Sequence, residues 1–162
     1  MEPRPAPDWQ TTAWLNTQEA LSLQKLRGRV ILLHAFQLLC PGCVAHSLPQ
    51  AKRVAELFAD AKLSVIGLHT VLEHHEAMGI ETLRAFLHEN RIRFPVGIDM
   101  PGTNGDPIPQ TMRSYAMQGT PTAVLIDARG RLRQQVFGAY DDLLLGAEIG
   151  TLLIEAQQDS AA

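Results

Sequence analysis

Residues 30–43 read VILLHAFQLLCPGC and contain both cysteines of the chain, Cys40 and Cys43. Residues 30–36 are β-branched and apolar on both faces, a pattern typical of a strand that is buried inside a sheet. Gly28 precedes this run as a turn signal. The sequence therefore predicts a central strand that is followed directly by a Cys-x-x-Cys motif at the start of a helix.

Strand and helix patterns alternate along the rest of the chain. Apolar residues that recur every three or four positions predict helices, and short apolar runs between turn residues predict strands. After the cysteines we expect, in order, a helix at 51–58, a strand at 63–68, a helix at 82–90, a strand at 94–98, a loop at 100–109, a helical turn at 111–115 and a hairpin of strands 123–126 and 132–137. Asp141 is the predicted cap of a last helix that carries Leu144, Leu145, Ile149, Leu152 and Leu153. This order predicts an α/β fold with a central mixed β-sheet flanked by helices, in which parallel strands come first and a hairpin comes later.

Length and composition describe one globular domain. The chain has 162 residues, of which 46% are hydrophobic and 19% are charged, and this excludes a disordered chain, a collagen-like repeat and a coiled coil. We expect an N-terminal extension at residues 1–20, the folded domain at 21–155 and a C-terminal tail at 156–162. The Pro-rich start and residues 157–162 are expected to be frayed.

Charge and hydropathy argue against two classes of partner. Lys and Arg together number 14 and Asp and Glu 17, a net charge of −3, so no basic field is available for a nucleic acid or an anionic membrane. The longest mostly apolar stretch, residues 30–39, is too short to span a bilayer. Residues 1–8 contain no apolar run of the kind found in secretory signals, so we expect a cytoplasmic protein.

The cysteine count points to redox chemistry. Two cysteines cannot hold a secreted scaffold together, and a structural disulfide is not expected in a reducing compartment. At a helix N-terminus Cys40 is the candidate nucleophile, and Cys43, one turn later, is the candidate resolving thiol. The predicted function is a thiol–disulfide oxidoreductase that acts on a disulfide-containing protein or a small thiol substrate. We expect an unidentified thiol or flavoprotein as electron donor and no cofactor.

Three segments outside the cysteine motif resemble a known family. Residues 21–33 are similar to its lead-in to the active-site strand, residues 86–96 to its inserted helix and strand, and residues 119–127, which read GTPTAVLID, to its cis-proline segment. The chain resembles the thioredoxin-like redoxins, in particular the TlpA-like branch of the AhpC/TSA–redoxin superfamily, from about residue 21 to residue 153. The resemblance implies a thioredoxin-like fold with an inserted helix and strand, and a cis peptide bond before Pro121.

Pro121 also has a physical argument of its own. A cis X–Pro bond costs little and makes a sharp turn, which would place the backbone of Thr120 opposite the sulfurs, ready to pair with an extended substrate strand. The proline would also remove an N–H from the surroundings of the thiolate. The alternative is an ordinary trans proline at the start of an edge strand, and the residues alone leave it open.

The motif departs from that of thioredoxins at several positions. Leu39 stands where thioredoxins carry Trp, the pair between the cysteines is Pro-Gly rather than Gly-Pro, and Pro49, the predicted kink of the helix, lies one residue further from Cys43 than usual. His34 stands six residues before Cys40, where thioredoxins keep a buried carboxylate. A buried imidazole there could accept the proton of Cys43 or shift the pKa of Cys40. Alternatively, His34 is a packed strand residue that is hydrogen-bonded to backbone or water.

A peroxiredoxin is the nearest enzymatic alternative. Peroxidatic cysteines follow the pattern Pro-x-x-x-Thr/Ser-x-x-Cys, but Leu33 and Gln37 stand seven and three residues before Cys40. The peroxiredoxin arginine before a later strand is also missing, because Gly119, Thr120 and Pro121 occupy that region. These departures argue against a conventional peroxidase.

The alternatives of another class are a metal site and an interaction module without redox activity. Cys40, Cys43 and His46 form a Cys-x-x-Cys-x-x-His sequence. Further candidate ligands follow later in the chain at His69, Glu73, His74, His75 and Glu76. A structural zinc site usually takes its four ligands as two separated pairs, and a second cysteine pair is absent from the sequence, so we predict no metal. A redox-inactive module remains an alternative, but it leaves the paired cysteines without a role.

Overall fold

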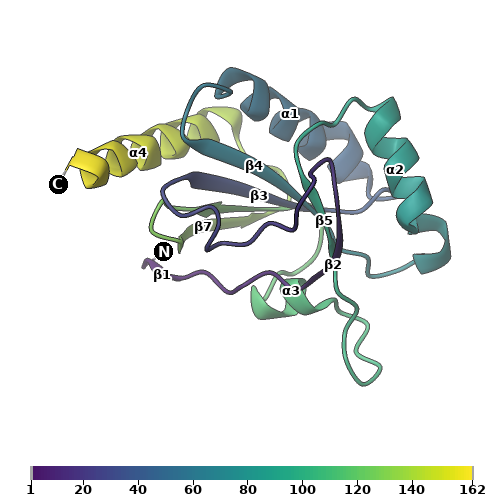
Figure 1. Cartoon of the computed structure of the whole chain (residues 1–162). Helices are drawn as coiled ribbons and strands as arrows, with labels where there is room; N and C mark the ends of the chain where they lie inside the picture. Colours follow the sequence, from purple (N-terminus) through teal and green to yellow (C-terminus); the bar gives the residue numbers. More distant parts are fainter. Residues whose placement is uncertain (1, 162) are drawn as a thin grey trace.

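A seven-stranded sheet forms the centre of the molecule (Figure 1). The structure is a computed structural model, and it describes residues 2–161. The strands lie in the order β1-β7-β6-β3-β4-β5-β2. β3 (Val30–Phe36), the strand that precedes the cysteines, lies in the middle of the sheet, and all of its residues are buried.

Three neighbouring strands are parallel and two form a hairpin. β3 pairs in parallel with β4 (Leu63–His69), which pairs in parallel with β5 (Val96–Asp99). On its other side β3 is antiparallel to β6 (Thr122–Ile126), and β6 forms a hairpin with β7 (Arg131–Phe137). The predicted mixed sheet is confirmed. Because parallel strands end at the same edge of a sheet, the loops after β3, β4 and β5 lie at one edge, where α/β proteins commonly bind ligands.

Helices cover both faces of the sheet. The helical elements are η1 (Cys43–Ser47), α1 (Leu48–Leu57), η2 (His75–Met78), α2 (Ile80–Glu89), α3 (Gln110–Ser114) and α4 (Asp142–Ala161). α1, α2 and α4 bury their apolar sides on one face, whereas α3 packs on the other (Figure 1). None of the helices within residues 2–161 combines the length and the apolar character needed to cross a membrane.

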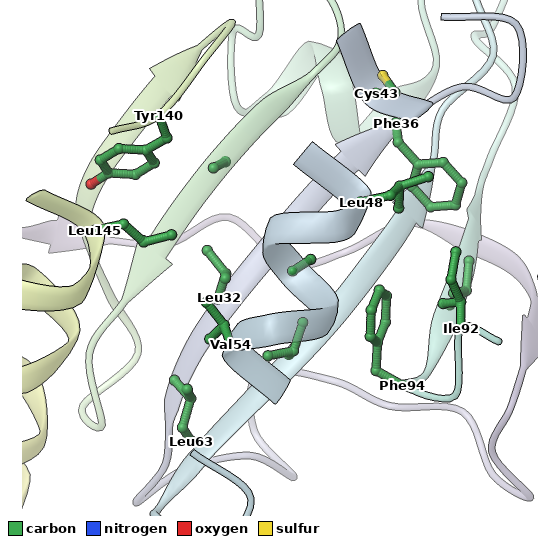
Figure 2. Close-up of a cluster of buried hydrophobic side chains, with 14 of the residues drawn as sticks. Leu32, Phe36, Cys43, Leu48, Val54, Leu63, Ile92, Phe94, Tyr140 and Leu145 are labelled. Atoms are coloured by element: carbon green, nitrogen blue, oxygen red, sulfur yellow. The ribbon is translucent and has the colours of Figure 1, made fainter. Parts of the chain in front are cut away.

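The alternation of side chains along β3 divides the interior into two clusters. Leu32 and Phe36 face the cluster that contains Leu48 of α1, and Figure 2 shows Phe36 close to Leu48, with Leu32 further along the strand. Leu33 and Ala35 face the opposite cluster. A strand that is apolar on both faces can therefore bury every side chain, and each large one stabilises the fold by about 2 kcal/mol.

Both edges of the sheet come from N-terminal residues that the sequence analysis placed in an extension outside the folded domain. β1 (Arg4–Pro5) pairs with β7, and β2 (Thr11–Leu15) pairs with β5, both antiparallel. Between them the Ala6 N–H donates to the carbonyl oxygen of Gly130 at 3.0 Å. The expectation of a frayed Pro-rich start is therefore wrong for β1, and β2 belongs to the folded sheet as well. Both strands form because β7 and β5 each have a free edge whose backbone groups a short segment can pair with.

The expectation of a frayed C-terminal tail is also wrong for the residues that the structure describes. α4 continues through the predicted tail to Ala161, the last residue that the structure describes. Arg129 forms an ion pair with Asp159 in the last turns of this helix. Arg133, on β7, donates to Glu155 one turn earlier at 2.5 Å. These contacts connect the end of α4 to the β6–β7 hairpin.

Candidate active site

The two cysteines are joined in a disulfide beyond the end of β3. Their Cα atoms lie 5.2 Å apart. Cys43 is completely buried in the cluster on the α1 side of the sheet, whereas Cys40 is half-buried. A molecule that approaches from solvent therefore reaches the sulfur of Cys40 first.

The chain enters a helix directly at the motif. Residues 41 and 42 are already helical, and η1 continues from them. The Cys43 N–H donates to Cys40 Sγ at 3.2 Å, and the Val44 N–H donates to the carbonyl oxygen of Cys40 at 3.1 Å. An N–H donor and the positive end of a helix dipole both favour a negatively charged sulfur. The site is therefore built to stabilise the thiolate of Cys40 once the disulfide is reduced.

Pro49 shapes the helical turn that holds Cys43. Proline has no N–H to donate to the preceding turn. The turn before it is the π-helical η1, in which the Leu48 N–H donates to the carbonyl oxygen of Cys43. Ser47 Oγ donates to the same oxygen at 3.3 Å. The kink expected near Pro49 thus takes the form of a widened turn that begins at the buried cysteine.

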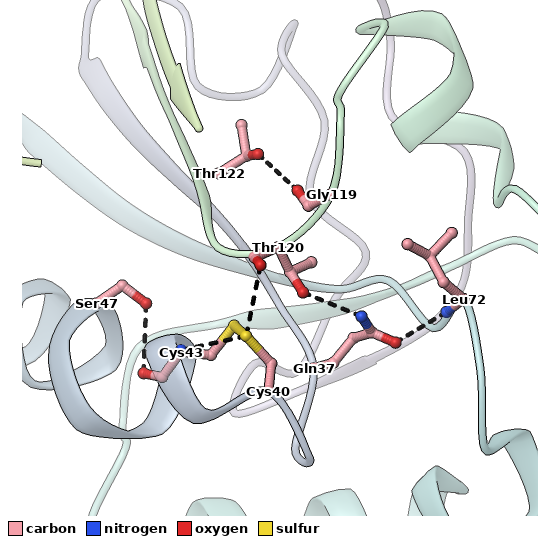
Figure 3. The surroundings of a disulfide bond; sticks show 8 residues. All are labelled: Gln37, Cys40, Cys43, Ser47, Leu72, Gly119, Thr120 and Thr122. Atoms are coloured by element: carbon pink, nitrogen blue, oxygen red, sulfur yellow. Dashed lines mark hydrogen bonds between the residues drawn. A yellow bond between two sulfur atoms is a disulfide. The ribbon is translucent and has the colours of Figure 1, made fainter. Parts of the chain in front are cut away.

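The loop that precedes β6 lies against the disulfide (Figure 3). The Thr120–Pro121 peptide bond is cis, and the carbonyl oxygen of Thr120 lies 3.5 Å from Cys40 Sγ. The Pro121 ring faces the motif from close by, since a Cβ added to Gly42 would lie 3.4 Å from Pro121 Cδ. The structure therefore brings Thr120 and Pro121 together with the cysteines, 80 residues apart in the sequence.

Gln37 also belongs to this site, although the sequence analysis considered it only as a departure from peroxiredoxins. Its Nε2 donates to Thr120 Oγ1 at 3.0 Å, and its Oε1 accepts from the Leu72 N–H at 2.9 Å. Both ends of the amide are therefore engaged by protein groups. The only signal in the sequence was a polar residue between a buried strand and the motif, which does not reveal these distant partners.

His34 lies on β3, two residues from Leu32 and two from Phe36. Side chains two residues apart on a strand point to the same face, so His34 faces the cluster that contains Cys43. Its ring stacks on the ring of Phe36, with the centroids 6.3 Å apart. The side chain is buried, and its Nε2 has no hydrogen-bond partner. Burial lowers the pKa of His34 to about 4, so the imidazole is neutral at neutral pH. Its influence on the sulfurs stays a prediction.

A groove of about 490 Å³ extends from the motif along the start of α1. It begins at Gly42 and Pro121, and it is bounded by the helix on one side and by the loop after β7 on the other. At its far end Arg53 and Asp142 form a salt bridge at 2.7 Å. The groove offers space for a segment of a ligand that extends away from the disulfide.

The residues proposed as metal ligands do not converge. Within residues 2–161 no group of three or more His, Cys, Asp and Glu side chains lies close enough together to hold a metal ion. His46 is exposed on η1, whereas His69 is buried at the end of β4. The described residues therefore do not assemble the cluster that the metal alternative requires.

Comparison with known proteins identifies the family. Residues 3–135 match the AhpC/TSA family, a span that includes both cysteines and the cis-proline loop. The chain belongs to this family. The resemblance found in the sequence is thereby confirmed for this AhpC/TSA protein.

Two solved structures are similar to this AhpC/TSA protein in both fold and sequence. Thioredoxin-like superfamily protein SPOA0173 is 54% identical with a TM-score of 0.88, over 92% of this chain and 96% of that chain. A thiol-disulfide isomerase from Corynebacterium glutamicum is 45% identical with a TM-score of 0.87, over the same shares of the two chains. These similarities confirm the thioredoxin-like fold.

Curated relatives of this AhpC/TSA protein are much longer. Protein DipZ of Mycobacterium bovis is 28% identical over 155 residues, which are 94% of this chain and 21% of DipZ. NHL repeat-containing protein 2 of Bos taurus is 25% identical over 127 residues, which are 77% of this chain and 16% of that protein. The chain thus spans about a fifth of the length of the curated relatives it matches.

Proposed function

We propose that this AhpC/TSA protein is a thiol–disulfide oxidoreductase that cycles Cys40 and Cys43 between a dithiol and a disulfide. One observation carries the proposal: a half-exposed and a fully buried cysteine are paired at a helix start, beside Thr120 and Pro121. The similarity to a thiol-disulfide isomerase supports it.

Cys40 performs the first step. In the reduced protein its thiolate attacks one sulfur of a substrate disulfide, and a new S–S bond joins Cys40 to the substrate. The other substrate sulfur leaves as a thiolate and takes a proton from solvent. The Cys43 N–H, 3.2 Å from Cys40 Sγ in the oxidised protein, stabilises the attacking charge.

Cys43 completes the cycle. Its thiol loses a proton, and its sulfur attacks Cys40 Sγ. The bond between Cys40 and the substrate breaks, and the second substrate sulfur leaves and is protonated. Two electrons have then passed from the protein dithiol to the substrate disulfide, and the protein is left with the disulfide observed here. An external dithiol donor returns two electrons by the reverse steps.

We infer that the substrates are disulfide-containing proteins. An extended polypeptide has backbone donors and acceptors that can pair with the backbone of Thr120, and its continuation can enter the groove between α1 and the loop after β7. A small disulfide would leave both features unused.

The direct test measures the reduction of insulin disulfides with a dithiol donor, in parallel with the consumption of hydrogen peroxide. We expect the wild-type protein to accelerate insulin reduction and Cys40→Ser to be inert. Consumption of peroxide without reduction of insulin would favour the peroxiredoxin alternative, and inactivity in both assays would favour the redox-inactive module.

A further inference from the structure

Gln37 connects three segments that meet at the disulfide. It follows β3 directly, and its side chain is buried. Nε2 donates at 3.0 Å to Oγ1 of Thr120, in the loop before β6, and Oε1 accepts at 2.9 Å from the N–H of Leu72, in the loop after β4 (Figure 3). A single side chain therefore ties the cysteine loop to the two loops beside it.

The backbone determines which way this amide points. The Leu72 N–H can only donate, so it must face Oε1 of Gln37 rather than Nε2. Nε2 is then turned toward Thr120 Oγ1, which acts as the acceptor. The two hydrogen bonds of the Gln37 amide, to Thr120 and from Leu72, are called the Gln37 bridge below. Rotating the amide so that its oxygen and nitrogen change places would lose the bond from Leu72, so the orientation of the amide is fixed.

Thr120 is the residue through which the bridge reaches the sulfurs. Its carbonyl oxygen lies 3.5 Å from Cys40 Sγ. Thr122 Oγ1 donates a hydrogen bond to the carbonyl oxygen of Gly119 at 2.7 Å. This bond joins two residues of the same segment and does not connect it to the cysteines. The Gln37 side chain supplies that connection.

We propose that Gln37 is a positioning residue that holds the backbone of Thr120 where a polypeptide disulfide can pair with it while its sulfur meets Cys40. This inference rests on the proposed function. Gln37 acts through Thr120, because both of its side-chain hydrogen bonds go to protein groups rather than to a sulfur.

The two kinds of disulfide substrate should respond differently to the loss of this bridge. Insulin presents a peptide backbone beside its disulfides, so its reaction depends on where Thr120 lies. Hydroxyethyl disulfide has no backbone, so it depends on Cys40 and Cys43 alone. A general defect in folding or in sulfur chemistry would lower both rates together, whereas a positioning defect changes their ratio.

The experiment measures kcat/KM for insulin and for hydroxyethyl disulfide in the wild-type protein, Gln37→Leu, Thr120→Val and the double variant. Leu fills a similar volume without hydrogen bonds, and Val removes the acceptor hydroxyl of Thr120. We expect the insulin-to-hydroxyethyl disulfide ratio of kcat/KM to fall about tenfold in Thr120→Val, the effect of one lost hydrogen bond. Gln37→Leu also loses the bond from Leu72, so its ratio should fall at least as far. The double variant should fall no further than Gln37→Leu, because Thr120→Val removes a bond that Gln37→Leu has already removed.

Two further variants separate positioning from bulk effects. Gln37→Glu keeps an oxygen at each of the two hydrogen-bonding positions. One oxygen can accept from the Leu72 N–H. The other can accept from the Thr120 hydroxyl when the carboxyl group is ionised, or donate to it when the group is protonated. We expect it to restore the ratio to within about threefold of wild type. Gln135→Leu is the matched control, because Gln135 on β7 donates to the carbonyl oxygen of Tyr115 at 3.1 Å, away from the site. Its ratio should equal that of wild type.

An unchanged ratio in Gln37→Leu and Thr120→Val, or an equal fall for both disulfides, would overturn the positioning role and leave the proposed function intact. Failure of the wild-type protein to react with either disulfide would instead overturn the proposed function. If Gln37→Leu does not fold, Thr120→Val still decides, because it breaks the same hydrogen bond at its half-buried partner.

Discussion

Exposure distinguishes the two cysteines, and we expect it to set the order in which they react. Cys40 is half-buried and accepts the N–H of Cys43, whereas Cys43 has no exposed surface. A substrate disulfide can therefore reach Cys40, and Cys43 can reach only the bond that Cys40 has formed. The sequence predicts the same order by a different argument, because the free N–H groups at a helix start favour a thiolate on the first cysteine.

The roles of the cysteines can be separated by trapping. We expect Cys43→Ser to accumulate a mixed disulfide between Cys40 and the substrate, because the resolving sulfur is absent. Cys40→Ser should form none, because Cys43 is buried. Non-reducing electrophoresis and mass spectrometry of the trapped species give the readout. Faster alkylation of Cys43 than of Cys40 in the reduced wild-type protein would contradict the assignment.

Substitutions of His34 test whether a charge at this position changes the pKa of the Cys40 thiol. The imidazole is neutral because burial lowers its pKa to about 4, so it does not repel a thiolate. His34→Asp would place a carboxylate on the side of the sheet that holds Cys43, and we expect the measured pKa of Cys40 to rise by about one unit. His34→Asn is the matched neutral control and should titrate like wild type. Thiolate absorbance against pH measures the effect, and identical curves for Asp and Asn would leave His34 as a packing residue only.

Among the elements, α4 packs against the sheet and is capped at its N-terminus by the side chain of Asp141, the residue before it. Asp141 Oδ1 accepts the N–H groups of Leu143 and Leu144 at 2.9 and 3.0 Å, which confirms the predicted cap. The helix that follows buries Leu145 and Ile149 against the sheet. The cap satisfies donors that the first turn of a helix otherwise leaves unpaired.

Removal of this cap should destabilise the protein without affecting the chemistry. We expect Asp141→Ala to lower the free energy of unfolding by about 1 kcal/mol in a urea titration. Asp141→Ser retains a capping oxygen and should lose only a small part of that value. A loss in Asp141→Ser as large as in Asp141→Ala would show that the cap does not account for the effect.

Local pattern predicted some elements and could not predict others. β3 was evident because it is apolar on both faces, and the β6–β7 hairpin because a turn sequence lies between its strands. β1 and β2 were not evident, because an edge strand is defined by its partner, and β7 and β5 lie far along the chain. The same reason applies to the site. The motif and Pro121 had local signals, whereas Gln37 depends on Thr120, 83 residues away.

At the scale of the whole molecule, two buried histidines make the free energy of unfolding depend on pH. The rings of His34 and His69 both lie beside the ring of Phe36, with centroid distances of 6.3 and 5.4 Å. In both, Nε2 has no hydrogen-bond partner. Burial lowers the pKa of each from 6.5 to about 4. The folded protein therefore keeps both rings neutral at pH values where the unfolded chain would protonate them.

The sign of the effect follows from this difference. Above the unfolded pKa of 6.5 neither state is protonated, and the contribution of the histidines to stability is fully present. As the pH falls below 6.5 the unfolded chain gains protons first, so stability is lost progressively until the folded pKa near 4 is reached. Asp99 acts in the opposite direction, because burial raises its pKa and the folded protein takes up that proton earlier than the unfolded chain.

We therefore expect the free energy of unfolding to fall between about pH 7.5 and pH 5, with a contribution of about 2 kcal/mol from each histidine. Urea titrations at the two pH values measure the fall in wild type, His34→Leu and His69→Leu. Each substitution should reduce the fall by about 2 kcal/mol, whatever its effect on absolute stability, because the comparison is made within each variant. A fall as large in both variants as in wild type would rule out the two histidines as its cause. Acid sensitivity also arises from ion-paired carboxylates such as Glu155 and Asp159, whose pKa values their arginine partners hold low. Protonation of those groups destabilises the fold only at lower pH, so the position of the transition also distinguishes the two causes.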